Sequence, residues 1–166
     1  ALSAQKKDKE AISHLQLATK IAQDAYGPDS PQLSFYLSKW GWHYWQRRQL
    51  NKAHESFINS LSIVEYNIQK YPEAYSPFMG LAAVLSSQGK HLKANRLYKD
   101  HIIPGLKKYV GENHQRLAIA YGNYGIILNT LGETEKAEEA FLSSLSILEK
   151  RLGSNHLKLS VPLEGL

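Results

Sequence analysis

The feature that most constrains this chain is a segment that recurs at a nearly fixed interval. Four alanines, each early in an amphipathic stretch, are spaced by 42, 41 and 43 residues: Ala11, Ala53, Ala94 and Ala137. Two later stretches end at glycines 42 residues apart, and each glycine opens a similar short segment, Gly-Glu-Asn-His and Gly-Ser-Asn-His. Self-similarity at such a period is typical of a solenoid, whose usual role is to present a binding surface.

Length and composition fit one globular domain with a continuous core. The chain has 166 residues, of which 43% are hydrophobic, and no apolar run approaches the roughly 18 residues that a membrane span needs. The first ten residues are polar and basic and lead into no signal-peptide core. Because the chain also does not begin with Met, we expect it to be a piece of a longer protein.

Charge and cysteine content exclude several classes of function. There is no cysteine, which excludes disulfides, thiolate zinc sites and a cysteine nucleophile, but it does not fix the compartment. The net charge is +5, and the lysines and arginines are scattered without a block of five or six. Solvated helix faces and cationic helix ends explain this pattern better than a nucleic-acid stripe. We therefore predict no nucleic-acid and no membrane partner.

Apolar residues at three- and four-residue steps, interrupted by glycine and proline, predict seven full helices. Ser30 and Pro31 have the residue types that favour a helix start, and Pro104-Gly105 predicts a kink or break, with helix resuming from Leu106. An eighth helix opens at 157–166 and is limited by Pro162. The expected ranges of the seven are 5–26, 31–48, 51–71, 76–88, 91–109, 114–131 and 133–152.

Small and large residues alternate at fixed offsets within this pattern. A small residue lies 12 positions before three of the repeat alanines, and an aromatic residue lies four positions after each of them. Such a pairing of holes and knobs lets two helices approach closely. The short linkers between helices favour antiparallel neighbours, so we predict stacked helical hairpins and an all-α fold. The small residues are Gly41, Ala82 and Gly125, and the aromatic ones are Phe57, Tyr98 and Phe141.

These residues resemble the tetratricopeptide repeat, and the 42-residue period is similar to that of the kinesin light chain subtype. The turn glycines Gly89 and Gly132 also match, whereas Arg48 departs from that pattern. The resemblance implies a right-handed α-solenoid, a superhelix of antiparallel helix pairs, with three full repeats and a half repeat at each end. The expected boundaries are 5–29 for the second helix of a partial repeat, 30–72, 73–112 and 113–155 for the repeats, and 156–166 for a truncated one. The terminal helices lack polar capping faces, which makes the ends candidates for self-association.

The resemblance also implies that the first helix of each pair lines a concave groove that binds a peptide or a partner protein. Asn123 matches an asparagine that in such repeats bonds a peptide backbone, Lys39 at the equivalent site suits a carboxylate, and Gly80 leaves a gap between them. Aromatic residues on the first pair suit an apolar anchor. The expected groove residues are Phe35, Lys39, Trp42, Trp45, Gln46, Met79, Ala83, Asn123, Ile126 and Asn129.

Two alternatives remain open at this point. In a longer protein the aromatic residues can instead pack against a preceding helix outside this sequence. The whole segment can also be a structural scaffold within a larger protein, with no ligand of its own. An enzyme is not expected, because there is no zinc-binding His-Glu-x-x-His, no phosphate loop and no paired acid and base. We predict no cofactor and no metal. His114 and His156 recur with the repeat, which indicates helix caps or turn-packing groups.

Overall fold

A computed structural model describes residues 2–64, 75–152, 162 and 165. This part of the chain is built from helices and has no strand, so the all-α prediction is confirmed. The helices are α1 (Leu2–Tyr26), α2 (Pro31–Gln46), α3 (Leu50–Val64), α4 (Tyr75–Ser87), α5 (His91–Leu97), the π-helical η3 (Tyr98–Ile102), α6 (Ile103–Val110), α7 (Gln115–Thr130) and α8 (Thr134–Leu152). The end expected for the third helix near Tyr71, the eighth helix except for residues 162 and 165, and His156 lie outside the described residues.

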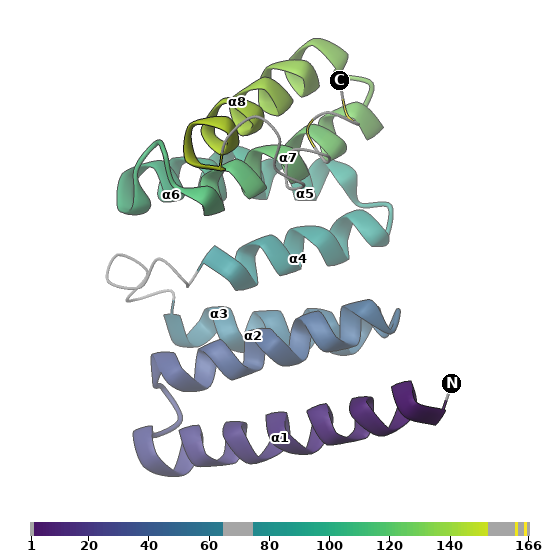
Figure 1. Ribbon diagram of the computed structural model, residues 1–166, viewed down its shortest axis with the longest axis vertical. Helices are drawn as coiled ribbons and strands as arrows, with labels where there is room; N and C mark the ends of the chain where they lie inside the picture. Colours follow the sequence, from purple (N-terminus) through teal and green to yellow (C-terminus); the bar gives the residue numbers. More distant parts are fainter. Residues whose placement is uncertain (1, 65–74, 153–161, 163–164, 166) are drawn as a thin grey trace. The chain divides into compact units, whose positions relative to one another are not determined.

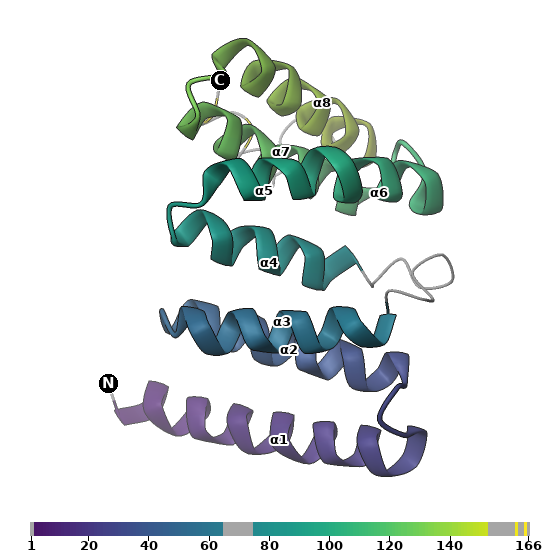
Figure 2. The same cartoon turned by 180° about the vertical axis from the view of Figure 1, so that it is seen from behind.

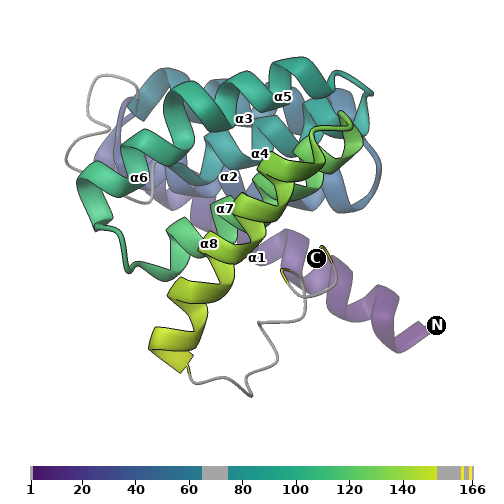
Figure 3. The ribbon, with the colours of Figure 1, turned by 90° about the horizontal axis from the view of Figure 1, so that it is seen from above.

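The chain forms two compact units, Ala1–Leu81 and Ala82–Leu166, with the boundary inside α4. In unit 1, α2 packs against α1 and α3 and runs antiparallel to both (Figures 1 and 2). In unit 2, α7 packs against α8, and α5 continues through η3 into α6 as one rod (Figures 2 and 3). Neighbouring antiparallel helices are therefore present in each unit, as the short linkers predict. The expected division into one domain with its repeat boundaries stays a prediction.

In unit 1, one aromatic ring is packed between two glycines. Phe57 of α3 is fully buried. A Cβ atom placed on Gly41 of α2 would lie 2.5 Å from the Phe57 ring, and one placed on Gly80 of α4 would lie 2.2 Å from it. Carbon atoms attract one another at about 3.5–4.0 Å, so any larger residue at either site would overlap the ring. The predicted match of a large residue with a small one is confirmed for Gly41 and Phe57.

The same arrangement occurs in unit 2, around Phe141 of α8. A Cβ atom on Gly125 of α7 would lie 2.6 Å from the ring, and one on Gly165 would lie 2.3 Å from it. Phe141 is 84 positions after Phe57, and Gly125 is 84 positions after Gly41. The repeat of the sequence is therefore also a repeat of one specific packing contact.

Buried serines add a second repeated contact. The Ser60 hydroxyl donates to the backbone oxygen of Ser34 at 2.8 Å, and the Ser144 hydroxyl donates to that of Ala118 at 2.8 Å. Ser60 and Ser144 are both buried, and each residue of the second pair lies 84 positions after its counterpart in the first. Each bond ties the second helix of a pair to the backbone of the first. This contact was not predicted, although the spacing of 84 residues between Ser60 and Ser144 follows the repeat and indicates a shared role.

Of the kink or break expected at Pro104, the break does not occur, and the helix is locally altered into a π turn. The chain passes through the five residues of η3 and continues as α6 to Val110, without leaving the helix. The backbone N–H of Ile103 donates to the oxygen of Tyr98, five residues earlier. This wider turn moves the preceding carbonyl groups away from their α-helical places, where the carbonyl of Asp100 would clash with the proline ring.

Three helix ends share one turn, although only two of them carry glycine. Gly89 and Gly132 have φ angles of 74° and 77°, and Arg48 has a φ of 59°. In each turn the next residue donates its backbone N–H to an oxygen five residues back; for Gln49 this is Tyr44, at 3.0 Å. Arg48 thus occupies the turn-glycine site, and it adopts a left-handed conformation that costs a residue with a side chain roughly 1–2 kcal/mol.

Replacing Arg48 with glycine should raise the free energy of unfolding by about 1 kcal/mol, because glycine accepts this conformation without strain. Chemical denaturation of the two proteins measures the difference. Arg48→Ala is the matched control, since it also removes the side chain but keeps the strained φ. A gain of equal size in the alanine variant would show that the side chain, not the backbone, causes the effect.

His114 is the N-cap of α7, as its recurrence in the sequence predicts. Its Nδ1 atom accepts a hydrogen bond from the backbone N–H of Arg116 at 3.1 Å. Ser30, 84 positions earlier, caps α2 in the same way through the N–H of Leu33. Burial lowers the pKa of His114, and the charges of Arg116 and Arg151 lower it further. Each of these effects favours the neutral imidazole, the form that can accept the bond.

Because its pKa is lower in the folded protein than in the unfolded chain, His114 should make the fold less stable in acid. Its contribution is complete above the unfolded value of about 6.5 and is lost as the pH falls through the folded value. His114→Ser replaces the cap with the residue used at position 30. Denaturation from about pH 8 to about pH 5 should show a smaller acid-induced loss of stability in the variant; equal losses in both proteins would contradict this role.

Candidate binding surfaces

The first candidate surface lies on α2, in unit 1. Phe35 exposes 46% of its surface, and the Lys39 ammonium lies 5.0 Å from the centre of its ring. This distance is within the range of a cation–π contact. Lys39 and Gln46 are exposed. The three side chains therefore offer an apolar ring, a positive charge and an amide on one helix.

The two tryptophans of α2 are half-buried. The Trp42 ring packs edge-on against Phe57, with 5.4 Å between ring centres, and against Trp45, with 5.6 Å. The Trp42 indole N–H donates to the Ser76 hydroxyl of α4 at 3.3 Å. Trp42 thus helps to hold α3 and the start of α4 against α2, so part of this ring serves packing within unit 1.

On α4, the predicted residues Met79 and Ala83 are half-buried. Gly80, which the sequence places at the site equivalent to Asn123, is buried against Phe57. At this site α4 therefore packs against its neighbour instead of presenting a polar group.

The second candidate surface lies on α7, in unit 2. Ile126 exposes 49% of its surface, Ile119 exposes 43%, and Asn129 is exposed. Asn123 is half-buried, and its side chain is hydrogen-bonded to the hydroxyl of Tyr98. Burial raises the pKa of Tyr98, and this hydrogen bond opposes the rise. The Asn123 amide, predicted to contact a peptide, thus already has one partner within the fold.

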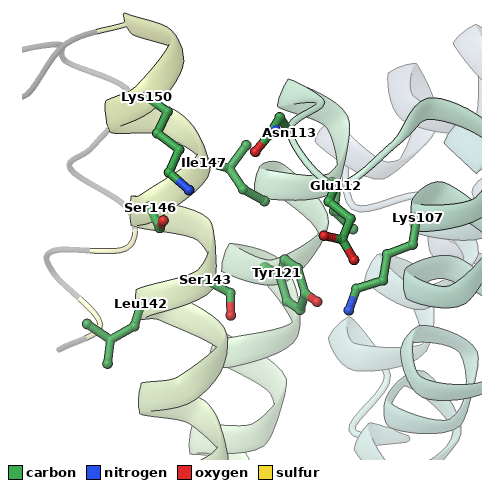
Figure 4. A pocket seen from close by; sticks show the side chains of 10 residues that line it. Lys107, Glu112, Asn113, Tyr121, Leu142, Ser143, Ser146, Ile147 and Lys150 are labelled. Carbon is green, nitrogen blue, oxygen red and sulfur yellow. The ribbon is translucent and has the colours of Figure 1, made fainter.

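A third feature was not predicted from the sequence. A hollow of about 390 Å³ lies in unit 2 among α6, the α6–α7 turn, α7 and α8. Figure 4 shows Lys107, Glu112 and Tyr121 on one side and side chains of α8, including Ser143 and Lys150, on the other. None of the predicted groove residues lines it. In the sequence Lys107 and Lys150 resemble scattered surface charge, although their separation of 43 equals the interval from Ala94 to Ala137 and places them at equivalent positions of two repeats.

The described residues also bear on metal binding and membrane insertion. No set of three histidine, aspartate or glutamate side chains there could hold a metal ion. No helix in the same part of the chain is both long and apolar enough to cross a bilayer.

Comparisons with known proteins identify the repeat. The family profile described as tetratricopeptide repeat matches residues 73–150. The crystal structure of BtubC (BKLC) from P. vanneervenii matches with a TM-score of 0.83 and 20% sequence identity, over 99% of this chain and 65% of that one. No curated protein matches the sequence. Residues 73–150 are therefore assigned to the tetratricopeptide repeat, and the chain has a TPR-like solenoid fold, as the sequence predicts.

The presence of this repeat implies a coarse function. Tetratricopeptide repeats are in general protein-interaction modules, and the fold is typically non-enzymatic. At 20% identity, the structural match shows the fold alone. The chain also spans only 65% of the length of BtubC.

The hydrogen bond between Tyr98 and Asn123 makes a testable contribution to stability. Tyr98 is 2% exposed, so its hydroxyl has little access to water. Tyr98→Phe removes the bond and should lower the free energy of unfolding by about 0.5–1.5 kcal/mol. Urea denaturation measures the change, and Tyr26→Phe serves as control because Tyr26 exposes 61% of its surface. An unchanged stability of Tyr98→Phe would mean that the bond contributes nothing to the fold.

Proposed function

We propose that this chain binds an extended peptide or a partner protein along the exposed faces of the first helices of its repeats. These faces lie on α2 in unit 1, on α4, and on α7 in unit 2. Recognition combines apolar anchors with polar contacts. The anchors are Phe35, Trp45, Met79, Ala83 and Ile126, with part of Trp42, and the polar groups are Lys39, Gln46, Asn123 and Asn129.

The observation that carries the proposal is the exposed ring of Phe35 with the Lys39 ammonium above it. Large aromatic residues are enriched among the residues that dominate binding energy. A ring that is 46% exposed can bury further area against an apolar side chain, while the ammonium stays free to meet a carboxylate beside it. The coarse role of the repeat family as an interaction module supports the same conclusion.

One observation favours a second function, a structural scaffold without a ligand of its own. Trp42 contacts Phe57 and bonds to Ser76, so part of the aromatic surface already serves the packing of unit 1. A scaffold role predicts that the exposed part of the surface binds nothing by itself. The two functions therefore differ in what happens when Phe35 is removed.

Peptides selected from a random library on the intact chain should bind Phe35→Ala at least about tenfold more weakly, because the variant loses the central anchor. Fluorescence anisotropy measures the affinities. Ile58→Ala is the matched control, since Ile58 of α3 exposes 42% of its surface but lies on the second helix of its pair.

Phe35 is a better site for this substitution than Trp42 or Asn123, because both of those side chains form hydrogen bonds within the fold. Equal affinities of the selected peptides for Phe35→Ala and the parent chain would contradict the α2 surface. A selection that yields no binder at all would favour the scaffold role.

A further inference from the structure

The hollow in unit 2 has features of a binding site that the repeat family does not account for. Its volume of about 390 Å³ falls within the range of roughly 300–1,000 Å³ that is common for ligand sites. Leu117 and Ile147 are buried and supply an apolar floor. Polar side chains on both walls surround this floor (Figure 4).

One wall holds a lysine that is already positioned. The Lys107 side chain is hydrogen-bonded to Tyr121 and lies 5.8 Å from the centre of its ring. Glu112 adds an attractive charge from the turn that follows α6. These contacts restrict the flexible lysine side chain before any ligand arrives, so less conformational entropy remains to be lost on binding.

The opposite wall supplies a second positive charge. Lys150 lies near the end of α8 on the far side of the hollow from Lys107 (Figure 4). On the same helix, the Ser143 hydroxyl donates to the Glu139 carbonyl at 2.9 Å, so its oxygen can still accept a hydrogen bond from a ligand N–H. The charged groups of the lining are two lysines and one glutamate, a net charge of +1 (2 − 1).

We propose that this hollow binds an acidic segment of a partner protein, with carboxylates at Lys107 and Lys150 and an apolar side chain on the floor between them. Two ammonium groups on opposite walls suit two separated carboxylates better than one compact anion. The apolar floor would gain nothing from a bare inorganic ion. The site uses α6, the α6–α7 turn, α7 and α8, and it does not depend on the α2 surface.

Glu112 provides a second test of this proposal, in which a substitution should tighten binding instead of weakening it. Its carboxylate repels an acidic ligand while it holds Lys107 in place. Removing its charge should therefore tighten binding, although removing a single surface charge usually has little effect. Glu138 of α8 is also exposed and does not line the hollow, which makes Glu138→Gln a matched control for Glu112→Gln.

The probe is a fluorescein-labelled peptide of glutamates with one central leucine, titrated against the intact chain at low salt. Reversing both lysines, Lys107→Glu with Lys150→Glu, should weaken binding by about tenfold or more. Lys93→Glu with Lys99→Glu is the control, because it changes the net charge equally at exposed positions outside the hollow. This control should bind nearly as tightly as the parent chain.

Three results would overturn the proposal. Equal losses in the two double variants would mean that the peptide senses only the overall charge. No detectable binding to the parent chain would exclude the site for this ligand class. Displacement of the peptide by an equal concentration of inorganic phosphate would assign the hollow to a compact anion instead. Tighter binding by Glu112→Gln, together with unchanged binding by Glu138→Gln, would support it.

Discussion

The packing of an aromatic ring between two glycines is the contact on which the rest of the structure depends. In unit 1 the Phe57 ring fills the space that Gly41 and Gly80 leave open, and in unit 2 Phe141 does the same with Gly125 and Gly165. Each ring comes from the second helix of a pair. One glycine comes from the first helix of the same pair, and the other comes from the segment that follows. A single aromatic side chain therefore sets the distance between the two helices of a pair and the position of the segment that follows them.

This packing decides which residues remain for function. The side of a first helix that faces the ring carries small residues, so its opposite side is free to carry large ones. On α2 that division separates Gly41 from the exposed Phe35 and Lys39, and on α7 it separates Gly125 from the exposed Ile119. Some residues of these helices contribute to both tasks. Trp42 and Asn123 are of this kind, since each is half-buried and has a partner inside its unit.

Much of the fold followed from the sequence because the signals were local or periodic. Glycine and proline placed the helix ends to within a few residues, and the spacing of Gly41 from Phe57 identified a packing contact. The turn at Arg48 shows that the repeat register can specify a backbone conformation even where the usual glycine is missing. These inferences needed only the period and the conformational preferences of single residues.

Other features could not be predicted, because they depend on contacts between residues distant in the sequence. Proline at position 104 predicts a disturbed helix, but whether the chain breaks or widens into a π turn depends on the packing of Tyr98 and Ile102, which are both buried. The bond from Trp42 to Ser76 and the hollow between Lys107 and Lys150 join residues more than 30 positions apart. The repeat interval relates Lys107 to Lys150 but does not show that their side chains line one hollow, so only the three-dimensional structure brings them together.

A double-mutant cycle on Gly80 and Phe57 tests the central claim most directly. Gly80→Ala alone should lower the free energy of unfolding by about 1–3 kcal/mol, because the new methyl group overlaps the ring. In the background of Phe57→Leu, which shortens that side chain, the same change should cost at least about 1 kcal/mol less. If Gly80→Ala is stabilising, as helix propensity alone would make it, or if its effect is the same in both backgrounds, the ring does not set the spacing of these helices.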